Sequence, residues 1–139
     1  MPRKRTLIPS PLAWTTLNMP VAQYLRATEE HTLQMAVLQH LRIAARPGVF
    51  AFAIPNAGKR SLKQAMRMKR EGMMAGVADL CVMMDEGRTG WLELKSSKGT
   101  QKEAQREFET LCAFLSHNYA VCRNLYEAID ILRTWGATR

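Results

Sequence analysis

The sequence has few cysteines and no long apolar run, and each shortage excludes a class of protein. Its three cysteines, Cys81, Cys112 and Cys122, lie far apart and lack the spacing of a zinc site or a disulfide framework. We therefore expect three reduced thiols in a cytoplasmic protein. No stretch approaches the roughly 18 consecutive apolar residues that a membrane-spanning helix needs. No long apolar segment follows the basic first residues, so we expect neither a membrane partner nor secretion.

Histidine is also scarce, which limits the kinds of catalysis that the chain can perform. There are three histidines, His31, His40 and His117, and no pair of them has the spacing of metal ligands. No serine or cysteine nucleophile motif accompanies them. We therefore assign all three to structural roles, and we expect no small-molecule cofactor.

What the chain does contain is typical of one folded domain. Its 139 residues are 47% apolar and 23% charged, which excludes a chain that is disordered throughout. Such a length can bury a hydrophobic core without disulfides or a structural metal. Residues 1–27 hold four prolines and a basic tip, and we interpret them as an N-terminal arm. We expect the folded domain to span residues 28–139.

The charge is strongly positive and unevenly distributed. Twenty Lys and Arg residues face 12 Asp and Glu residues, a formal net charge of +8. Residues 1–75 carry a net charge of +9, and residues 76–139 carry −1. A basic field of this size favours a polyanionic partner, most often a nucleic acid, although some small basic proteins are basic only for solubility.

The pattern of apolar residues predicts an α/β fold with the order α-β-β-β-α-β-α. Strands two and three are joined by a short glycine turn and should be antiparallel, whereas a helical crossover makes strands three and four parallel. The basic segment between the first two strands should be a helical insertion or an ordered loop. The result is a mixed four-stranded sheet flanked by helices. The expected elements are a helix from Thr28 as N-cap to Pro47, a buried strand over 49–54, strands over 77–84 and 91–95, a helix opened by a Thr100–Glu103 capping box, a strand over 119–123 and a helix capped by Asn124.

Three charged residues lie in strands where apolar residues are expected. Glu93 and Lys95 share one face of the third strand, because strand side chains alternate, and the hairpin brings Asp79 close to them. Two neighbouring carboxylates repel each other unless a cation lies between them, and Mg²⁺ is the natural hard cation for oxygen ligands. A lysine beside such an ion could orient a water molecule for phosphodiester hydrolysis. The alternative is a structural Glu93–Lys95 salt bridge on a solvent face.

The order of several motifs resembles the PD-(D/E)XK nucleases, and most closely their VRR-NUC branch. That pattern has a helical glutamate followed by glutamine, a Pro-Asn segment, a Gly-x-x-Asp strand, a Glu-Leu-Lys strand and a helix with an early glutamine. The resemblance covers residues 28–123, with Ala78 where the family usually has proline. The matching residues here are Glu30 with Gln34, Pro55 to Gly58, Gly76 to Asp79, Glu93 to Lys95, and Gln105.

The resemblance implies a restriction-endonuclease-like fold and Mg²⁺-dependent cleavage of DNA, with Mn²⁺ as a possible substitute. It implies that Asp79, Glu93 and the backbone carbonyl of Leu94 bind the metal, while Lys95 acts on the attacking water. Gln105 would brace the site from its helix. Glu30 would reach the site from the first helix. From the residues alone, Glu29 remains an alternative to Glu30.

A basic run and a neighbouring asparagine are the candidate DNA contacts. They lie between the first two strands and would bind phosphates beside the cleaved bond, although charge runs are usually solvated faces and turn chemistry alone explains the asparagine. The candidates are Asn56, Lys59, Arg60, Lys63, Arg67, Lys69 and Arg70.

The leading hypothesis is a DNA endonuclease in the cytoplasm of a bacterial or phage-infected cell. The resemblance implies a homodimer that cuts branched DNA such as four-way (Holliday) junctions, since a two-fold dimer suits a two-fold substrate. One alternative is a nucleic-acid-binding module without catalysis. The other is the cutting subunit of a larger restriction or transposition complex.

Overall fold

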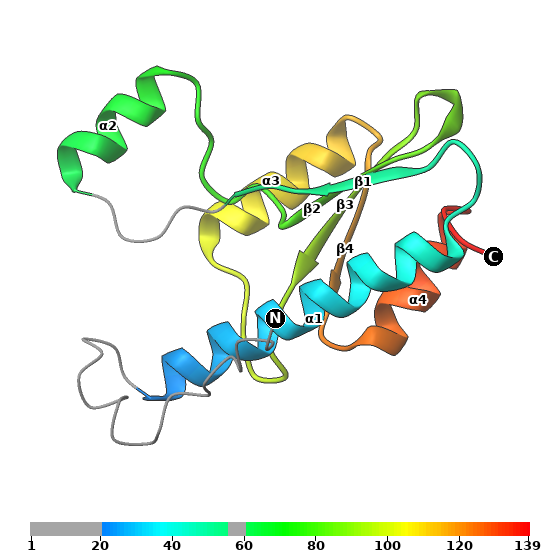
Figure 1. The fold of residues 1–139 in the computed structure, drawn as a ribbon. Helices are drawn as coiled ribbons and strands as arrows, with labels where there is room; N and C mark the ends of the chain where they lie inside the picture. The colour runs from blue at the N-terminus through cyan, green and yellow to red at the C-terminus, as the bar shows by residue number, and fades with distance from the viewer. Residues whose placement is uncertain (1–20, 56–60) are drawn as a thin grey trace, which may run out of the picture.

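The computed structural model describes the backbone of residues 21–55 and 61–139, with side chains from residue 28 onward. Four helices, four strands and one short 3₁₀ turn occupy these two ranges (Figure 1). Asn56, Lys59 and Arg60, which we predicted as DNA contacts, lie outside the described residues. In chain order the elements are α1 (Val21–Ala44), β1 (Phe50–Ala53), α2 (Leu62–Arg70), β2 (Leu80–Met83), η2 (Asp85–Gly87), β3 (Thr89–Leu94), α3 (Glu103–Phe114), β4 (Asn118–Cys122) and α4 (Leu125–Thr134).

The strands form one mixed sheet in the order β1-β2-β3-β4. β1 pairs with β2 and β2 with β3 in antiparallel fashion, and β3 and β4 are parallel. α3 is the crossover between the two parallel strands, so the predicted fold class and strand directions are confirmed.

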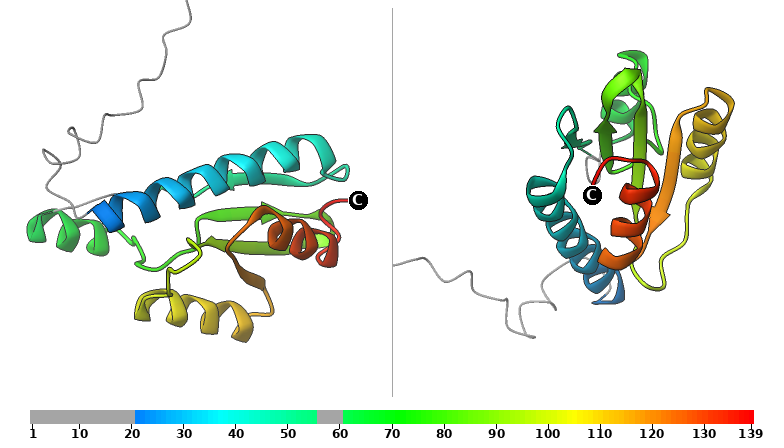
Figure 2. Two further views of the ribbon diagram at one scale, coloured as in Figure 1. Left: turned by 90° about the horizontal axis from the view of Figure 1, so that it is seen from below. Right: turned by 90° about the vertical axis from the view of Figure 1, so that its right-hand side faces the viewer.

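Helices cover both faces of this sheet. α1 and α4 lie on one face and α3 lies on the other (Figure 2). Leu92 and Leu94 of β3 point into the main core beneath α1 and α4, where they meet buried residues such as Val37 and Leu132. A smaller cluster around Phe108 packs α3 onto the opposite face. β3 is therefore buried on both sides, which makes it the central strand of the fold.

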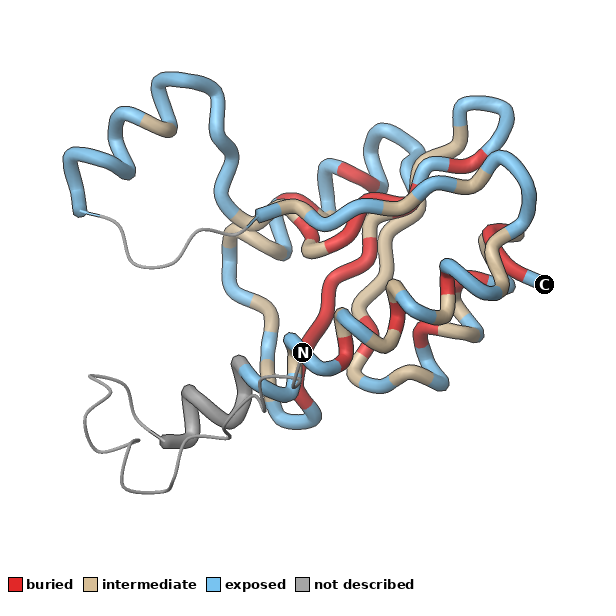
Figure 3. Tube along the Cα trace, viewed as in Figure 1, coloured by how far each residue is buried: buried red, intermediate tan, exposed pale blue. Residues whose placement is uncertain are grey.

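The basic segment forms the helix α2, which stands apart from the sheet (Figure 1). Ser61 caps it, because its hydroxyl group accepts a hydrogen bond from the Gln64 amide while the Gln64 side chain accepts one from the Ser61 amide. None of its residues is buried (Figure 3). The helical alternative for this segment is confirmed, but its thin apolar stripe packs on no core.

Three local expectations were wrong. α1 begins at Val21, so Thr28 lies inside the helix and is not its N-cap. The N-cap of α3 is Lys102 and not Thr100, because the Gln105 side chain accepts a hydrogen bond from the Lys102 amide. β1 was expected to be buried, but it is an edge strand with mostly exposed side chains, including Phe50.

Two further features of the structure concern the cysteines and the lengths of the helices. All three cysteines are free and buried, as predicted. Within the described ranges, no helix has the length and apolar character that crossing a membrane requires.

Candidate active site

The predicted acidic residues meet where β2 begins and β3 ends. Asp79 directly precedes β2, and the antiparallel register pairs Leu80 with Leu92, which places Asp79 beside Glu93. The Asp79 carboxylate accepts a hydrogen bond of 2.8 Å at Oδ2 from the Leu94 amide. This bond fixes the Asp79 side chain against the end of the central strand, on the wall of a cleft.

Glu93 is the most deeply buried charged residue of the site, with 1% of its surface exposed. Its Oε1 accepts a hydrogen bond of 2.7 Å from Gln105 Nε2 and lies 3.4 Å from the ammonium nitrogen of Lys95. Its Oε2 is equally buried, yet it accepts no hydrogen bond from any described residue. Buried carboxylate oxygens are normally paired or bound to a metal, so Oε2 stands out as an available ligand atom.

The environment of Glu93 favours its neutral form. Burial, followed by the negative charge of Asp79, raises the pKa of the Glu93 carboxyl group to about 8. The nearby Glu30 acts in the same direction, while Lys95 opposes the shift through its charge and its hydrogen bond. Lys95 alone therefore does not compensate the buried negative charge, and a further cation would.

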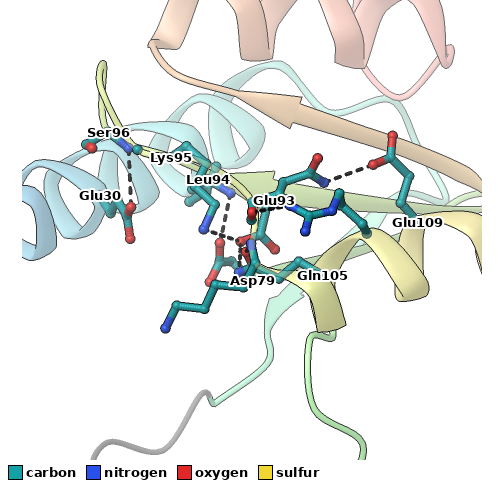
Figure 4. Close-up of polar contacts among 12 residues, drawn as sticks. Glu30, Asp79, Glu93, Leu94, Lys95, Ser96, Gln105 and Glu109 are labelled. Carbon is teal, nitrogen blue, oxygen red and sulfur yellow. Dashed lines mark hydrogen bonds and ion pairs between the residues drawn. The ribbon is translucent and has the colours of Figure 1, made fainter.

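A cleft of about 830 Å³ opens in front of these groups. All five predicted catalytic residues line it, although they come from α1, β2, β3, α3 and the adjoining loops (Figure 4). A carboxyl group with a raised pKa, such as Glu93, that shares a cleft with other carboxylates is typical of a functional site. The five residues are Glu30, Asp79, Glu93, Lys95 and Gln105.

Gln105 connects helix α3 to the site through both ends of its amide group. Its Oε1 accepts a hydrogen bond of 2.8 Å from the Lys102 backbone amide, and its Nε2 donates to Glu93. Because the amide oxygen is held by the start of the helix, the amino group is directed at the carboxylate. The residue that the resemblance alone suggested is thus a rigid support for Glu93.

Gly76 lies in the segment before β2, and it allows this segment to approach the first turn of α3 closely. Its φ is +80°, and a Cβ atom there would lie 2.2 Å from the carbonyl oxygen of Ala104. Only glycine allows both this backbone conformation and this approach. The glycine of the Gly-x-x-Asp motif therefore allows the segment that carries Asp79 and the helix that carries Gln105 to line one cleft.

The two glutamates at positions 29 and 30 have different surroundings. Glu30 lines the cleft and accepts a hydrogen bond of 3.3 Å from the Ser96 amide. Glu29 is exposed, accepts a bond of 2.8 Å from the Ser97 amide, and does not line the cleft. Both glutamates thus hold the loop after β3, and Glu30 is the one that faces the other carboxylates.

The residues present fit a Mg²⁺ ion, which binds oxygen atoms, keeps several waters and often uses only one or two carboxylates. Asp79 and Glu93 supply two neighbouring carboxylates, and Oε2 of Glu93 has no hydrogen-bond partner among the described residues. In the described ranges, no three His, Cys, Asp or Glu side chains gather closely enough to hold a metal by themselves. Backbone and water ligands would complete the coordination sphere.

Sequence reasoning missed two lysines in the loop between β3 and α3. Lys98 and Lys102 line the same cleft as Lys95 and add positive charge to its rim. Arg123 holds this loop from the end of β4, because its guanidinium donates hydrogen bonds to the carbonyl groups of Ser96 and Gly99. Their position soon after the Glu-Leu-Lys strand was the only hint in the sequence, and it did not show that the loop borders the cleft.

The described part of the basic run lies on α2, outside the catalytic cleft. Arg67 forms an exposed ion pair of 3.0 Å with Glu71, so this one positive charge of the basic run is partly compensated. Lys69 lines a neighbouring cavity. Lys63 and Arg70 are exposed.

Comparison with known proteins identifies the fold. No family model matches the sequence, and no curated protein matches it significantly. The similar solved structures include the following two. A "VRR_NUC domain protein" superposes with a TM-score of 0.62 at 19% identity, covering 77% of this chain and 87% of that one. A "VRR_NUC domain" has a TM-score of 0.54 at 13% identity, covering 77% of this chain and 97% of the other. The predicted VRR-NUC fold, a form of the PD-(D/E)XK nuclease fold, is confirmed.

Proposed function

We propose that this chain is a Mg²⁺-dependent endonuclease that hydrolyses DNA phosphodiester bonds in the cleft between β2, β3 and α3. The VRR-NUC fold supports a nuclease. The observation that carries the proposal is the buried Glu93 carboxyl group, whose Oε2 has no hydrogen-bond partner among the described residues. A structural salt bridge to Lys95 would account for Oε1, but it leaves Oε2 without a hydrogen-bond partner among the described residues.

Asp79, Glu93 and the backbone carbonyl of Leu94 would hold the ion, with waters in the remaining positions. Leu94 ends β3 and donates its amide hydrogen to Asp79, so it belongs to the same wall. When bound, Mg²⁺ lowers the pKa of a water molecule and offsets negative charge on the phosphate. Mn²⁺ has the same preference for oxygen ligands and should substitute.

The chain's own residues position the reacting groups. Lys95 is anchored beside Glu93, and we assign it to orient the attacking water and to stabilise the charge that develops on the phosphate. Gln105 keeps the Glu93 carboxylate in one orientation. Glu30 reaches the cleft from α1 and would bind the ion either directly or through a water molecule.

In the proposed reaction, one water molecule is added across one P–O bond. The water oxygen forms the new bond to phosphorus, the bond to the leaving sugar oxygen breaks, and that oxygen takes up a proton. The products are a strand end with a phosphate monoester and a strand end with a hydroxyl group. No oxidant or second substrate is required.

Positive side chains around the cleft would hold the DNA backbone. Lys98 and Lys102 lie at its rim, and Lys63, Lys69 and Arg70 lie on α2. Each phosphate contact releases counterions, so affinity should fall steeply as salt increases. Asn56, Lys59 and Arg60 lie outside the described residues, and we propose them as DNA contacts on the sequence alone.

We further propose that a homodimer presents two such sites to branched DNA, including four-way junctions. Phe50 and Phe52 are exposed on the edge strand β1, with ring centroids 6.2 Å apart, and Met83 lies opposite Phe50 in the register. Exposed apolar clusters of this kind often mark protein interfaces. A two-fold dimer would match the symmetry of a junction.

The test uses the purified chain with a labelled four-way junction and a linear duplex of the same sequence. Each DNA is incubated with Mg²⁺, Mn²⁺ or EDTA. The proposal expects metal-dependent cutting of the junction by the wild-type chain. It expects none by Lys95→Ala or Asp79→Asn, both of which should retain much of the DNA affinity.

Arg42→Ala is the matched control, because it removes one exposed positive charge from the end of α1. It should cut as the wild type does. Equal cutting of junction and duplex would keep the nuclease and remove the junction selectivity. Salt-sensitive binding without cutting in either metal would instead indicate a binding module or a subunit that requires a partner.

A further inference from the structure

A second cavity, of about 850 Å³, adjoins the catalytic cleft. The two share the segment from Ala75 to Val77 and the first turn of α3 at Ala104, so they form one continuous depression. None of the five residues assigned to catalysis lines this second cavity. We refer to it as the methionine groove, because Met73 and Met74 form one of its sides.

The groove presents apolar side chains to solvent next to the proposed reaction site. Met73 is 44% exposed and Met74 is 50% exposed, and Ile54, Val77 and Ala65 complete the apolar lining. Methionine is flexible and polarisable, so it adapts to flat ligands of different shape. Apolar side chains, methionine included, are inserted between bases by several classes of DNA-binding protein.

The charges at the groove distinguish a base from a phosphate as its occupant. Lys69 lies on the α2 side and Glu107 on the α3 side. A phosphate deep in the groove would be repelled by the Glu107 carboxylate. A nucleobase, by contrast, offers amino groups that can donate to a carboxylate, and its own phosphate could remain near Lys69. The asymmetry therefore fits a base between the walls with its backbone on the α2 side.

We propose that the methionine groove receives the base of an unpaired nucleotide close to the bond that is cut. This inference rests on the proposed nuclease function, because it depends on DNA entering the adjoining cleft. The base contacts Met73, Met74 and Val77, which all line the groove. The volume of the methionine groove is within the range of small-ligand sites, and its lining is mostly apolar as theirs is.

The groove gives a single subunit a physical reason to prefer branched DNA. A base in a continuous duplex must be unstacked before it can enter, whereas a base at a branch, gap or bulge is already partly free. The energetic cost of entering the groove is therefore lowest at interrupted duplexes. Selectivity would then be present in one subunit and would not require two-fold symmetry.

The experiment compares affinities for two DNAs that differ by one unpaired nucleotide. A fully paired duplex and the same duplex with a single-nucleotide bulge are titrated with the full chain in EDTA, so that metal-dependent cutting does not interfere. The bulged nucleotide is 2-aminopurine, whose fluorescence reports the surroundings of the base. The variant is Met73→Ser combined with Met74→Ser, which removes apolar contact without adding charge.

The wild type should bind the bulged DNA about tenfold more tightly than the paired DNA, the size expected for burial of one base. The double variant should lose this preference and the associated fluorescence change, while its affinity for the paired duplex stays the same. Met35→Ser is the matched control, because Met35 is 55% exposed on α1 and lines neither cavity. It should retain the preference.

Equal affinity of the wild type for the two DNAs would overturn the inference, as would a double variant that keeps the preference. A double variant that changes only the oligomeric mass would show that a second copy of the chain occupies the groove. These binding results do not depend on whether the chain cuts DNA, so they are independent of the test of the proposed function. A chain that discriminates the bulge but cuts no DNA in Mg²⁺ supports the groove and contradicts the nuclease.

Discussion

Gln105 donates a hydrogen bond of 2.7 Å to Glu93 and is itself held by the backbone at the start of α3. The orientation of the Glu93 carboxylate therefore depends on where the crossover helix α3 begins. This relationship joins the packing of the sheet to the chemistry proposed for the cleft. It also indicates which substitutions should separate folding from activity.

Removing the Gln105 side chain should impair cleavage more than folding. In Gln105→Ala, Glu93 keeps Lys95 as its partner but loses its fixed orientation, and supporting contacts of this kind are worth about 10- to 100-fold in activity or metal affinity. Cleavage rate and Mg²⁺ dependence measure the effect. Gln101→Ala is the control, since Gln101 bonds to Glu109 and Tyr119 and lies outside the lining of the cleft. Equal losses in both variants would contradict a specific role for Gln105.

Gly76→Ala should be far more damaging than Gly72→Ala. Both glycines have a positive φ, so each substitution carries the cost of left-handed backbone, about 1–2 kcal/mol. At Gly72 a Cβ atom would meet nothing within 4 Å, whereas at Gly76 it would collide with the backbone of Ala104. Chemical denaturation should therefore show a clearly larger loss of the free energy of unfolding for Gly76→Ala. Similar losses of the free energy of unfolding in the two variants would mean that the Gly76 segment does not pack tightly against α3.

The sequence predicted the central part of the site because that part depends on local periodicity. Glu93 and Lys95 share a face in any strand, and the short hairpin fixes Asp79 beside them. Packing decided the other features. The start of α3 at Lys102, and hence the direction of Gln105, depends on the contact with Gly76, which is distant in sequence. Gln105 was consequently found only through family resemblance.

The same reasoning explains where the sequence misled. The run around Phe50 and Phe52 is apolar, as a buried strand would be, but the order of the sheet places β1 at an edge. Apolar composition alone does not distinguish a strand buried inside the sheet from an edge strand whose apolar side chains are exposed. Lys98 and Lys102 were missed because a loop has no period, and only the fold shows that it borders the cleft.

The metal-free protein should become less stable as the pH rises from 4.5 to about 8. The pKa of Glu93 is raised from 4.5 to about 8 in the folded chain by burial and by Asp79. Between these values the folded chain keeps a proton that the unfolded chain has lost, so the free energy of unfolding falls as pH increases. Glu93→Gln removes this titration. Denaturation in EDTA at several pH values should show that the free energy of unfolding of the wild type, minus that of Glu93→Gln, falls as the pH rises from 4.5 to about 8. Parallel pH curves for the two proteins would contradict the raised pKa of Glu93.

Mg²⁺ should stabilise the protein more strongly at high pH than at low pH. A metal ligand must be ionised, so binding to Glu93 displaces its proton, and this displacement becomes easier near and above the pKa of about 8. The increase in melting temperature on addition of Mg²⁺ should therefore grow as the pH rises toward 8. Glu93→Gln should show little increase at any pH. A metal-induced shift of the same size in this variant would place the ion elsewhere.

Disrupting the exposed aromatic pair on β1 should convert the proposed dimer into a monomer. Phe50 and Phe52 lie on an edge strand and are 66% and 38% exposed, so replacing both with serine removes exposed apolar area. Light scattering coupled to size-exclusion chromatography should then give the mass of one chain, 15.8 kDa, instead of about twice that value. Tyr126→Ser is the control, because Tyr126 is exposed on α4, which covers the opposite face of the sheet from α3 (Figure 2). If the double variant stays dimeric while Tyr126→Ser becomes monomeric, the interface lies on the α4 side. If the monomer still prefers a four-way junction over a duplex, junction selectivity belongs to the single subunit and not to its two-fold symmetry.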